Sequence, residues 1–265
     1  MIRALRALPT LLRVGVAETV AYRAEFLVWI LTTTQPLIMM GLWTSVTRDA
    51  PFHGYTPSSM VAYYLSMLIV RQLTSNWVAW QMSEDVRLGV MSMRLLRPIH
   101  PFVAYAASHV AAIPFRSLVA LPLALILLFG SGASALATET SQLVLLPLSL
   151  ALAWLLTFAV LFTLGALAFW MTQIFAITNL YFGLFSLLSG YLLPLDLLPG
   201  PFAKVAAVSP FRFMASAPVE LMTKTLDREQ LELLIGGQLA WAAMMVIVAL
   251  AVWRAGVKRF EAVGG

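Results

Sequence analysis

Six apolar stretches, each near the roughly 20 residues that a helix needs to cross a bilayer, follow one another along this chain. We place the predicted spans at about 26–47, 59–80, 103–129, 143–169, 175–193 and 234–253. Of the 265 residues, 61% are hydrophobic and 11% are charged, against roughly 25% charged residues in soluble domains. The sequence therefore predicts an all-α integral membrane protein, with one six-span domain over residues 26–265.

Basic residues are distributed unevenly between the two sides of the membrane. With six spans, both termini lie on one side, and that side holds Arg3, Arg6, Arg13, Arg23, Arg87, Arg94, Arg97, Arg254, Lys258 and Arg259. The short loops on the other side hold only Arg48, and its long loop counts for less under the positive-inside rule. We therefore expect both termini in the cytoplasm and the protein in the inner (plasma) membrane. No cleavable signal is expected, because arginines interrupt every apolar run before residue 26.

Residues 1–25 have the pattern of an amphipathic helix. Apolar side chains occupy one helical face and mostly basic ones another, namely Leu5, Leu8, Leu12 and Val16 against Arg3, Arg6, Thr10 and Arg13. A helix lying on the cytoplasmic leaflet fits this pattern. A mitochondrial transit peptide fits less well, because the segment lacks serine and carries Glu18 and Glu25. A helix that only anchors the topology is a further alternative.

The loop between the second and third spans, residues 81–101, contains a helix signal. Ser83 is followed by two acidic residues, which suit the first turn of a helix, and Pro98 and Pro101 prevent a continuous helix into the third span. A short helix exposed to the cytosol would be a docking element for a partner protein. The alternative is an ordinary solvated loop.

The external segment 194–233 is too apolar for a free loop. Its prolines divide it into pieces too short to span, at Pro199, Pro201, Pro210 and Pro218. We expect one or two short helices that re-enter the outer leaflet or cover the outer end of a pathway. Asp227, with Gln230 three residues later, is expected to begin the last helix.

Two arginines, Arg71 and Arg116, lie inside predicted spans, where a charge costs at least about 2.5–3.5 kcal/mol unless it is paired or hydrated. No Asp or Glu lies in a span interior. The polar side chains form two stripes, one of Tyr64, Arg71 and Ser75 on the second span and one of His109 and Arg116 on the third, where Pro114 can bend the helix. One interpretation is that these stripes line a water-filled pathway or bind an anionic headgroup or substrate. Alternatively, the arginines snorkel or cap backbone carbonyls, and His109 is a packing residue.

The fifth span has a mildly polar face. Its members are Asn179, Phe182, Ser186 and Ser189, with Tyr181 and Phe185 beside them. An apolar or amphipathic substrate, or a membrane lipid, suits such a surface. Small polar residues at a contact between two helices explain it equally well.

The sequence lacks the motifs of several kinds of chemistry. The chain has no GxxxxGK[ST] loop for binding ATP, no HExxH zinc motif, and no cysteine for a disulfide, thiolate metal site or redox pair. We therefore expect no catalytic, cofactor or metal residues on this chain. Two other classes stay open: an ATP-independent channel or ion-coupled carrier, and an intramembrane enzyme that uses a residue such as His109 or Ser189.

The whole arrangement resembles the permease subunit of type-2 ABC exporters. The most specific part of the resemblance is the run SEDVRLG at 83–89 followed by RLLRP at 94–98, which is similar to the cytoplasmic loop of a bacterial branch of these permeases. The resemblance covers essentially the whole chain.

The resemblance implies a mechanism and partners. In such exporters two permeases pair, as a homodimer or with a sister permease, and each rests on a cytoplasmic ATPase that binds ATP and Mg. A coupling helix, here at about 84–96, transmits the motion of the ATPase, and the residues carried over to it are Glu84, Asp85, Arg87, Gly89, Arg94 and Arg97. Membrane lipids are expected partners and nucleic acid is not. The substrate cannot be carried over from the family.

Overall fold

The computed structural model describes residues 9–17, 34–171 and 173–260. Within these ranges every regular element is a helix, and there is no strand. Two helices are long and apolar enough to cross a membrane, α9 (Thr140–Ala166, continued by η3, Leu167–Phe169) and α14 (Arg228–Val257). A bent pair, Pro101–Leu118 with Ala120–Ala135, gives a third candidate among the described residues. The all-helical membrane fold is therefore confirmed, and the count of six spans stays a prediction.

The other helices of the bundle are shorter. They are α3 (Gln35–Val46), α4 (Pro57–Thr74), α5 (Val78–Arg87), α6 (Val90–Leu95), α7 (Pro101–Ala111), α8 (Ile113–Leu127), η1 (Leu128–Gly132), η2 (Ala133–Ala135) and α10 (Phe175–Leu188). Helix α3 is the described part of the predicted span 26–47, and α10 is shorter than the predicted 175–193.

The predicted second span is two helices, α4 and α5, with a break between them. Ser75 is extended, with φ −66° and ψ 147°, and α5 begins only at Val78. Helix α5 continues into the predicted loop, so Ser83 lies inside it and the prediction of a helix start at Ser83 was wrong. The reason is tertiary: Val78, Ala79 and Met82 are buried as α5 packs on α9, and this burial outweighs a local capping signal.

The predicted third span is divided as well. A turn at Ala112 separates α7 from α8, and the helix axis bends by 55° between Leu118 and Ala120. Pro114 lies in the first turn of α8, where proline is tolerated, so it does not cause this bend. Pro122 lies inside α8, and a proline ring clashes with the carbonyl four residues earlier, here that of Leu118.

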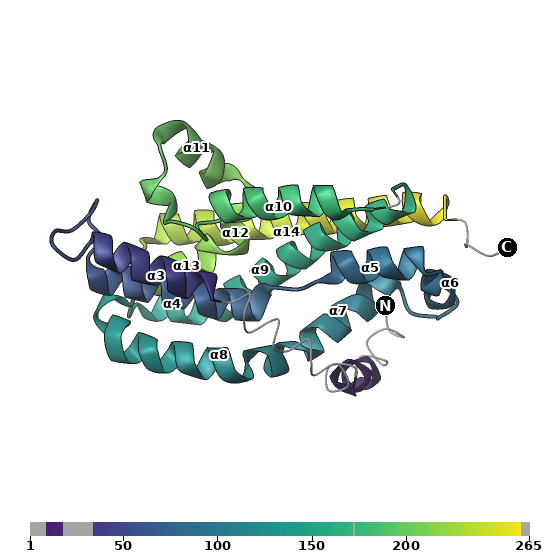
Figure 1. Ribbon diagram of the computed structural model, residues 1–265, viewed down its shortest axis with the longest axis horizontal. Helices are drawn as coiled ribbons and strands as arrows, with labels where there is room; N and C mark the ends of the chain where they lie inside the picture. The colour runs from purple at the N-terminus through teal and green to yellow at the C-terminus, as the bar shows by residue number, and fades with distance from the viewer. Residues whose placement is uncertain (1–8, 18–33, 172, 261–265) are drawn as a thin grey trace.

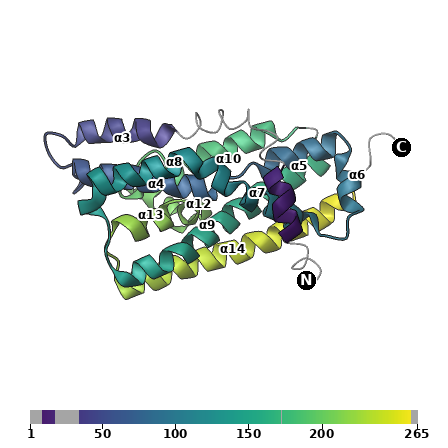
Figure 2. The ribbon, with the colours of Figure 1, turned by 90° about the horizontal axis from the view of Figure 1, so that it is seen from below.

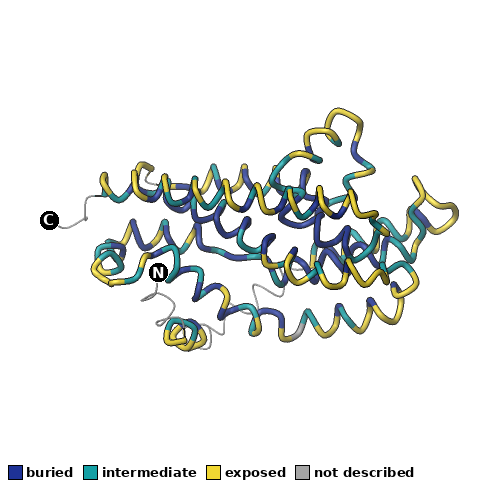
Figure 3. Tube along the Cα trace, turned by 180° about the vertical axis from the view of Figure 1, so that it is seen from behind, coloured by how far each residue is buried: buried dark blue, intermediate teal, exposed yellow. Residues whose placement is uncertain are grey.

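The core lies between α9 and the helices around it. Helix α9 packs along α14 and against α4, α5 and α13 (Ser216–Thr223). Aromatic rings pack around the C-terminal half of α9, for example Phe162 against Trp253 with ring centroids 5.5 Å apart. Gly165 allows α5 to approach closely, because a Cβ at this position would lie 3.0 Å from Ala79 Cα. Figure 3 shows the buried positions along the middle of the bundle and the exposed ones on its outer surfaces.

The segment 194–233 folds into short helices, as predicted, although there are more of them than the one or two expected. They are η4 (Leu195–Leu197), α11 (Gly200–Val208), α12 (Pro210–Met214) and α13. Pro201, Pro210 and Pro218 lie in first turns, where a missing amide hydrogen costs nothing. Helix α11 stands out from the bundle (Figure 1). Asp227 and Gln230 form the predicted capping box of α14.

The two ends of the bundle carry different elements. Figures 1 and 2 place α6, the helical residues 9–17 and the C-terminal end of α14 toward one end, and the α3–α4 loop and α13 toward the other. Residues 9–17 are helical, and Gly15 packs on Ser108 and Ala111 of α7. The buried position is therefore Gly15, whereas Val16 is exposed. The rest of the predicted amphipathic helix, including Arg3 and Arg6, lies outside the described residues.

Candidate functional site

The predicted coupling region is a sharp corner between two helices. Gly89 has φ 73°, a left-handed conformation that glycine adopts without strain, and it divides α5 from the six-residue α6. The single helix expected over about 84–96 is therefore two helices, and the coupling role of this region stays a prediction. We call residues 84–97 the α5–α6 corner.

Asp85 holds this corner together from inside. Its Oδ2 lies 2.7 Å from Arg94 Nε on α6, and it accepts a hydrogen bond from the Tyr105 hydroxyl on α7. The Arg94 guanidinium lies 4.6 Å from the centre of the Tyr105 ring. The Asp85 side chain is only 12% exposed, so the ion pair is shielded from water and joins three helices.

The outer surface of the corner has a different composition. Glu84 and Arg87 form an exposed ion pair at 3.7 Å, and Arg97 is exposed nearby in sequence. Four apolar side chains of the corner are exposed as well, namely Leu88, Val90, Met93 and Leu96, the last of them 80% exposed. The six residues carried over from the resemblance therefore fall into three sets. Asp85 and Arg94 form an inward pair, Glu84, Arg87 and Arg97 are exposed charges, and Gly89 forms the turn between the two helices.

The second group of predicted residues meets at the break between α4 and α5. Arg116 Nη1 on α8 donates to the Ser75 carbonyl at 2.5 Å and lies 3.3 Å from Ser75 Oγ. The Arg116 guanidinium lies 5.3 Å from the Trp77 ring centre, and His109 packs edge-on against Trp77 at 4.5 Å. The structure thus brings together Ser75 of one predicted stripe and both residues of the other. We call Ser75, Trp77, His109 and Arg116 the arginine site.

The remaining residues of the first stripe contact another part of the chain. Arg71 lies over the Phe185 and Tyr191 rings, at 4.6 and 5.4 Å, in cation–π contacts. The Tyr64 hydroxyl donates to the Leu192 carbonyl at 2.8 Å. Both side chains therefore fasten α4 to the segment that follows α10.

The predicted polar face of α10 does not form one surface. Asn179 is exposed, whereas Phe182 is stacked on Trp80 with ring centroids 5.3 Å apart. The Ser186 carbonyl accepts a hydrogen bond from the Leu192 amide at 3.2 Å. These three residues therefore have separate environments.

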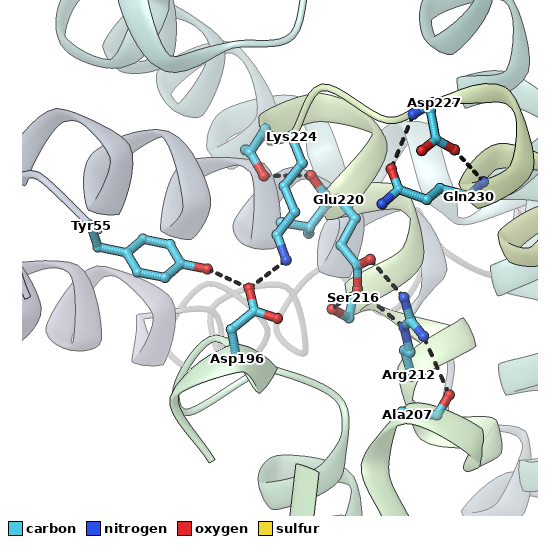
Figure 4. A network of polar contacts seen from close by, with 11 residues as sticks. Tyr55, Asp196, Ala207, Arg212, Ser216, Glu220, Lys224, Asp227 and Gln230 are labelled. Carbon is cyan, nitrogen blue, oxygen red and sulfur yellow. Dashed lines mark hydrogen bonds and ion pairs between the residues drawn. The ribbon is translucent and has the colours of Figure 1, made fainter. Parts of the chain in front are cut away.

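A polar network at the opposite end of the bundle was missed by the sequence analysis (Figure 4). Asp196 Oδ2 accepts from Lys224 Nζ at 2.5 Å and from the Tyr55 hydroxyl at 3.1 Å, and we call these three residues the outer latch. Burial raises the pKa of Asp196, but the hydrogen bonds from Lys224 and Tyr55 and the lysine charge outweigh burial and hold it below its ordinary value. The latch joins three segments that are far apart in the sequence, so no local pattern could have revealed it.

Beside the latch, a second ion pair stabilises the short helices. Arg212 donates from Nε and Nη2 to the two carboxylate oxygens of Glu220, at 3.2 and 2.9 Å, and the Ser216 hydroxyl donates to Oε1 at 2.8 Å. The Glu220 side chain is 7% exposed. This two-point contact fixes α12 against α13.

Two further residues of the sites, Tyr105 and Trp77, were also missed. Tyr105 reads as one more aromatic residue of an apolar span, and only the fold places it on Asp85. Asn76 follows an apolar run beside Ser75, a pairing that favours helix ends, and this signal could have indicated the break.

Comparison with known families agrees with this architecture. The long apolar helices define the class as a helical membrane protein. Residues 30–264 match the family described as ABC-2 family transporter protein, so the chain belongs to that family. The resemblance stated from the sequence is thereby confirmed. No curated protein matches the chain.

Proposed function

We propose that this protein is the permease subunit of an ATP-driven exporter whose ATP is hydrolysed on a separate cytoplasmic subunit. Two permeases would pair in the inner membrane, each with six spans and cytoplasmic termini, and segment 194–233 would form the outer gate. Membership of the ABC-2 transporter family supports the transport role, and such permeases generally work with a nucleotide-binding partner.

The exposed outer surface of the α5–α6 corner is the observation that carries the proposal. Isolated apolar side chains are common on protein surfaces, but Leu88, Met93 and Leu96 are exposed together among Glu84 and Arg87. An apolar centre with a charged rim is the usual composition of a protein interface. In the proposed topology this surface faces the cytosol, where the ATPase would bind.

The inward side of the corner supports a route for the motion. Because Asp85 connects α6 to α5 and α7, a push on α6 would move these two helices together. Helix α5 leads to the break at Ser75, and α7 carries His109 toward the same place. Movement of the ATPase would therefore reach the arginine site through rigid helices.

The test is affinity purification of the tagged permease from its native membranes in mild detergent, with an ATPase assay on the eluate. We expect an ATPase with a GxxxxGK[ST] loop to copurify with the wild type and to be lost from Leu96→Asp. Val208→Asp on α11 is the matched control, because Val208 is also exposed, at 70%, and lies in the proposed outer segment.

Each result has a defined meaning. Loss of the ATPase from Leu96→Asp but not from Val208→Asp supports docking at the corner. Wild-type ATPase recovery with Leu96→Asp refutes docking there. If the wild-type permease purifies without an ATPase and transports alone in vesicles, the channel or ion-coupled carrier replaces the exporter.

A further inference from the structure

The Arg116 guanidinium is buried and only partly used by the protein. It is 6% exposed, and its Nη1 caps the carbonyl end of α4 through Ser75. Its Nε and Nη2 are buried and have no hydrogen-bond partner among the residues that the structure describes. No carboxylate among the described residues pairs with it. Arginine keeps its charge in proteins, so a positive group with one free edge is enclosed here.

The free edge has the geometry that binds a carboxylate. Nε and Nη2 lie on the same side of a guanidinium and present two parallel N–H bonds. The same chain uses this edge elsewhere, since Arg212 binds the two oxygens of Glu220 with its Nε and Nη2. The Nε/Nη2 edge of Arg116, at the α4–α5 break, can therefore donate two hydrogen bonds to an anion with two oxygens.

Neighbouring groups favour the same occupant. His109 is 1% exposed, and within the described parts of the chain neither of its ring nitrogens has a hydrogen-bond partner. Arg71 adds a second positive charge within electrostatic reach of Arg116. The negative end of the α4 dipole and Ser75 offset only part of this charge.

A purely structural role for Arg116, as a cap of α4, explains fewer of its features than an anion site does. Capping of α4 uses one of the three guanidinium nitrogens of Arg116. A buried water could accept a hydrogen bond from another nitrogen, but it would not balance the charge, and an unbalanced buried charge is strongly unfavourable. An anion satisfies both the hydrogen bonds and the charge.

We propose that the free Nε/Nη2 edge of Arg116, together with His109, forms a binding site for a carboxylate or phosphate group. The site is closed in this conformation, because the free nitrogens are buried, and it opens when α5 moves relative to α8. That the bound anion belongs to the exported cargo rests on the proposed function, whereas binding itself does not.

The test measures thermal unfolding of the purified full-length permease in phosphatidylcholine nanodiscs, with three anionic probes and one neutral control. Decanoate is the anionic amphiphile and decyl maltoside its neutral counterpart, inorganic phosphate is the free anion, and nanodiscs containing phosphatidylglycerol supply an anionic headgroup. A ligand that binds only the folded state raises the unfolding temperature. We expect at least one anionic probe to raise it and decyl maltoside to leave it unchanged.

Variants at Ser75 separate the site from a general effect of charge. Ser75→Asp places a carboxylate beside Arg116, since Ser75 Oγ lies 3.3 Å from its Nη1. We expect this variant to unfold at or above the wild-type temperature without probe and to lose the response to anions. Ser75→Asn has the same shape without the charge and should keep the response. Arg254→Gln removes an exposed arginine and should keep it too.

The outcomes distinguish the source of the anion and the two proposals. A response to phosphate alone indicates a free anion, a response only to phosphatidylglycerol indicates a lipid headgroup, and each supports the site if Ser75→Asp abolishes it. No response in the wild type, or an equal response in Ser75→Asp, overturns the site. Because these measurements need no ATPase, the exporter proposal can fail while the anion site stands.

Discussion

Replacement of Asp85 by asparagine should loosen the α5–α6 corner while leaving the spans folded. Asparagine keeps the size of the side chain and an oxygen that can accept from Tyr105, but it removes the charge that faces Arg94 Nε at 2.7 Å. Arg94 would then be a cation in a partly buried place without a counterion. The loss of stability should be confined to the α5–α6 corner and should not extend to the core around α9.

The size of the effect follows from the exposure of the pair. Breaking a fully buried ion pair costs about 3–5 kcal/mol. Because the Arg94 side chain is 22% exposed, water can partly solvate it, and we expect a cost of about 2–3 kcal/mol. At about 2–4 °C per kcal/mol for a chain of this size, the unfolding temperature should fall by about 4–12 °C.

The assay is thermal unfolding of the purified permease by intrinsic tryptophan fluorescence, with Glu84→Gln as control. Glu84 is 63% exposed in an ion pair at 3.7 Å, so its change should cost under about 0.5 kcal/mol. A double-mutant cycle with Arg94→Met should give a coupling of about 1–3 kcal/mol. If Asp85→Asn unfolds within 1 °C of the wild type, or the cycle shows no coupling, the ion pair does not hold the corner.

Three further predictions concern other contacts. Gln142→Leu should destabilise the protein by about 2–4 kcal/mol in thermal unfolding, because the buried amide bonds three backbone groups of the segment 194–233, and an unchanged midpoint would refute that role. The Asp196 latch should be intact above the unfolded pKa of 3.8 and lost as pH falls through the lower folded value, so the difference in unfolding temperature between the wild type and Lys224→Met should shrink below about pH 4; a difference independent of pH would contradict this. Gly165→Ala should cost about 1–3 kcal/mol, because its added Cβ would lie 3.0 Å from Ala79 Cα on α5. Gly183→Ala, whose Cβ would meet nothing within 4 Å, should be neutral or stabilising, and equal effects of both in the same assay would exclude close packing as the cause.

Local features were predictable wherever one stretch of chain contains the whole cause. The long apolar runs of α9 and α14 mark helices by length and hydropathy alone. Asp227 and Gln230 form a cap within four consecutive residues. The prolines in the first turns of α11 and α12 act on their own backbone.

The helix breaks were only partly predictable. Pro114 and Pro122 look alike in sequence, but the first lies in the opening turn of α8 and the second inside the helix, so only the second bends it. The cap signal at Ser83 lost to the burial of the face that α5 packs on α9. Position within a helix and burial of a face are decided after the helices pack.

By itself, the sequence determined that this is a helical membrane protein, because hydropathy and chain-local capping do not depend on distant partners. The permease class came from the resemblance to a family, which the match over residues 30–264 confirms. The tertiary structure alone decided which side chains share a site. Asp85 and Tyr105 lie twenty residues apart, Ser75 and Arg116 forty-one, and Tyr55 and Asp196 one hundred and forty-one. Electrostatic and hydrogen-bond energies depend on distances of a few ångströms, and these distances exist only once the helices have been placed against one another.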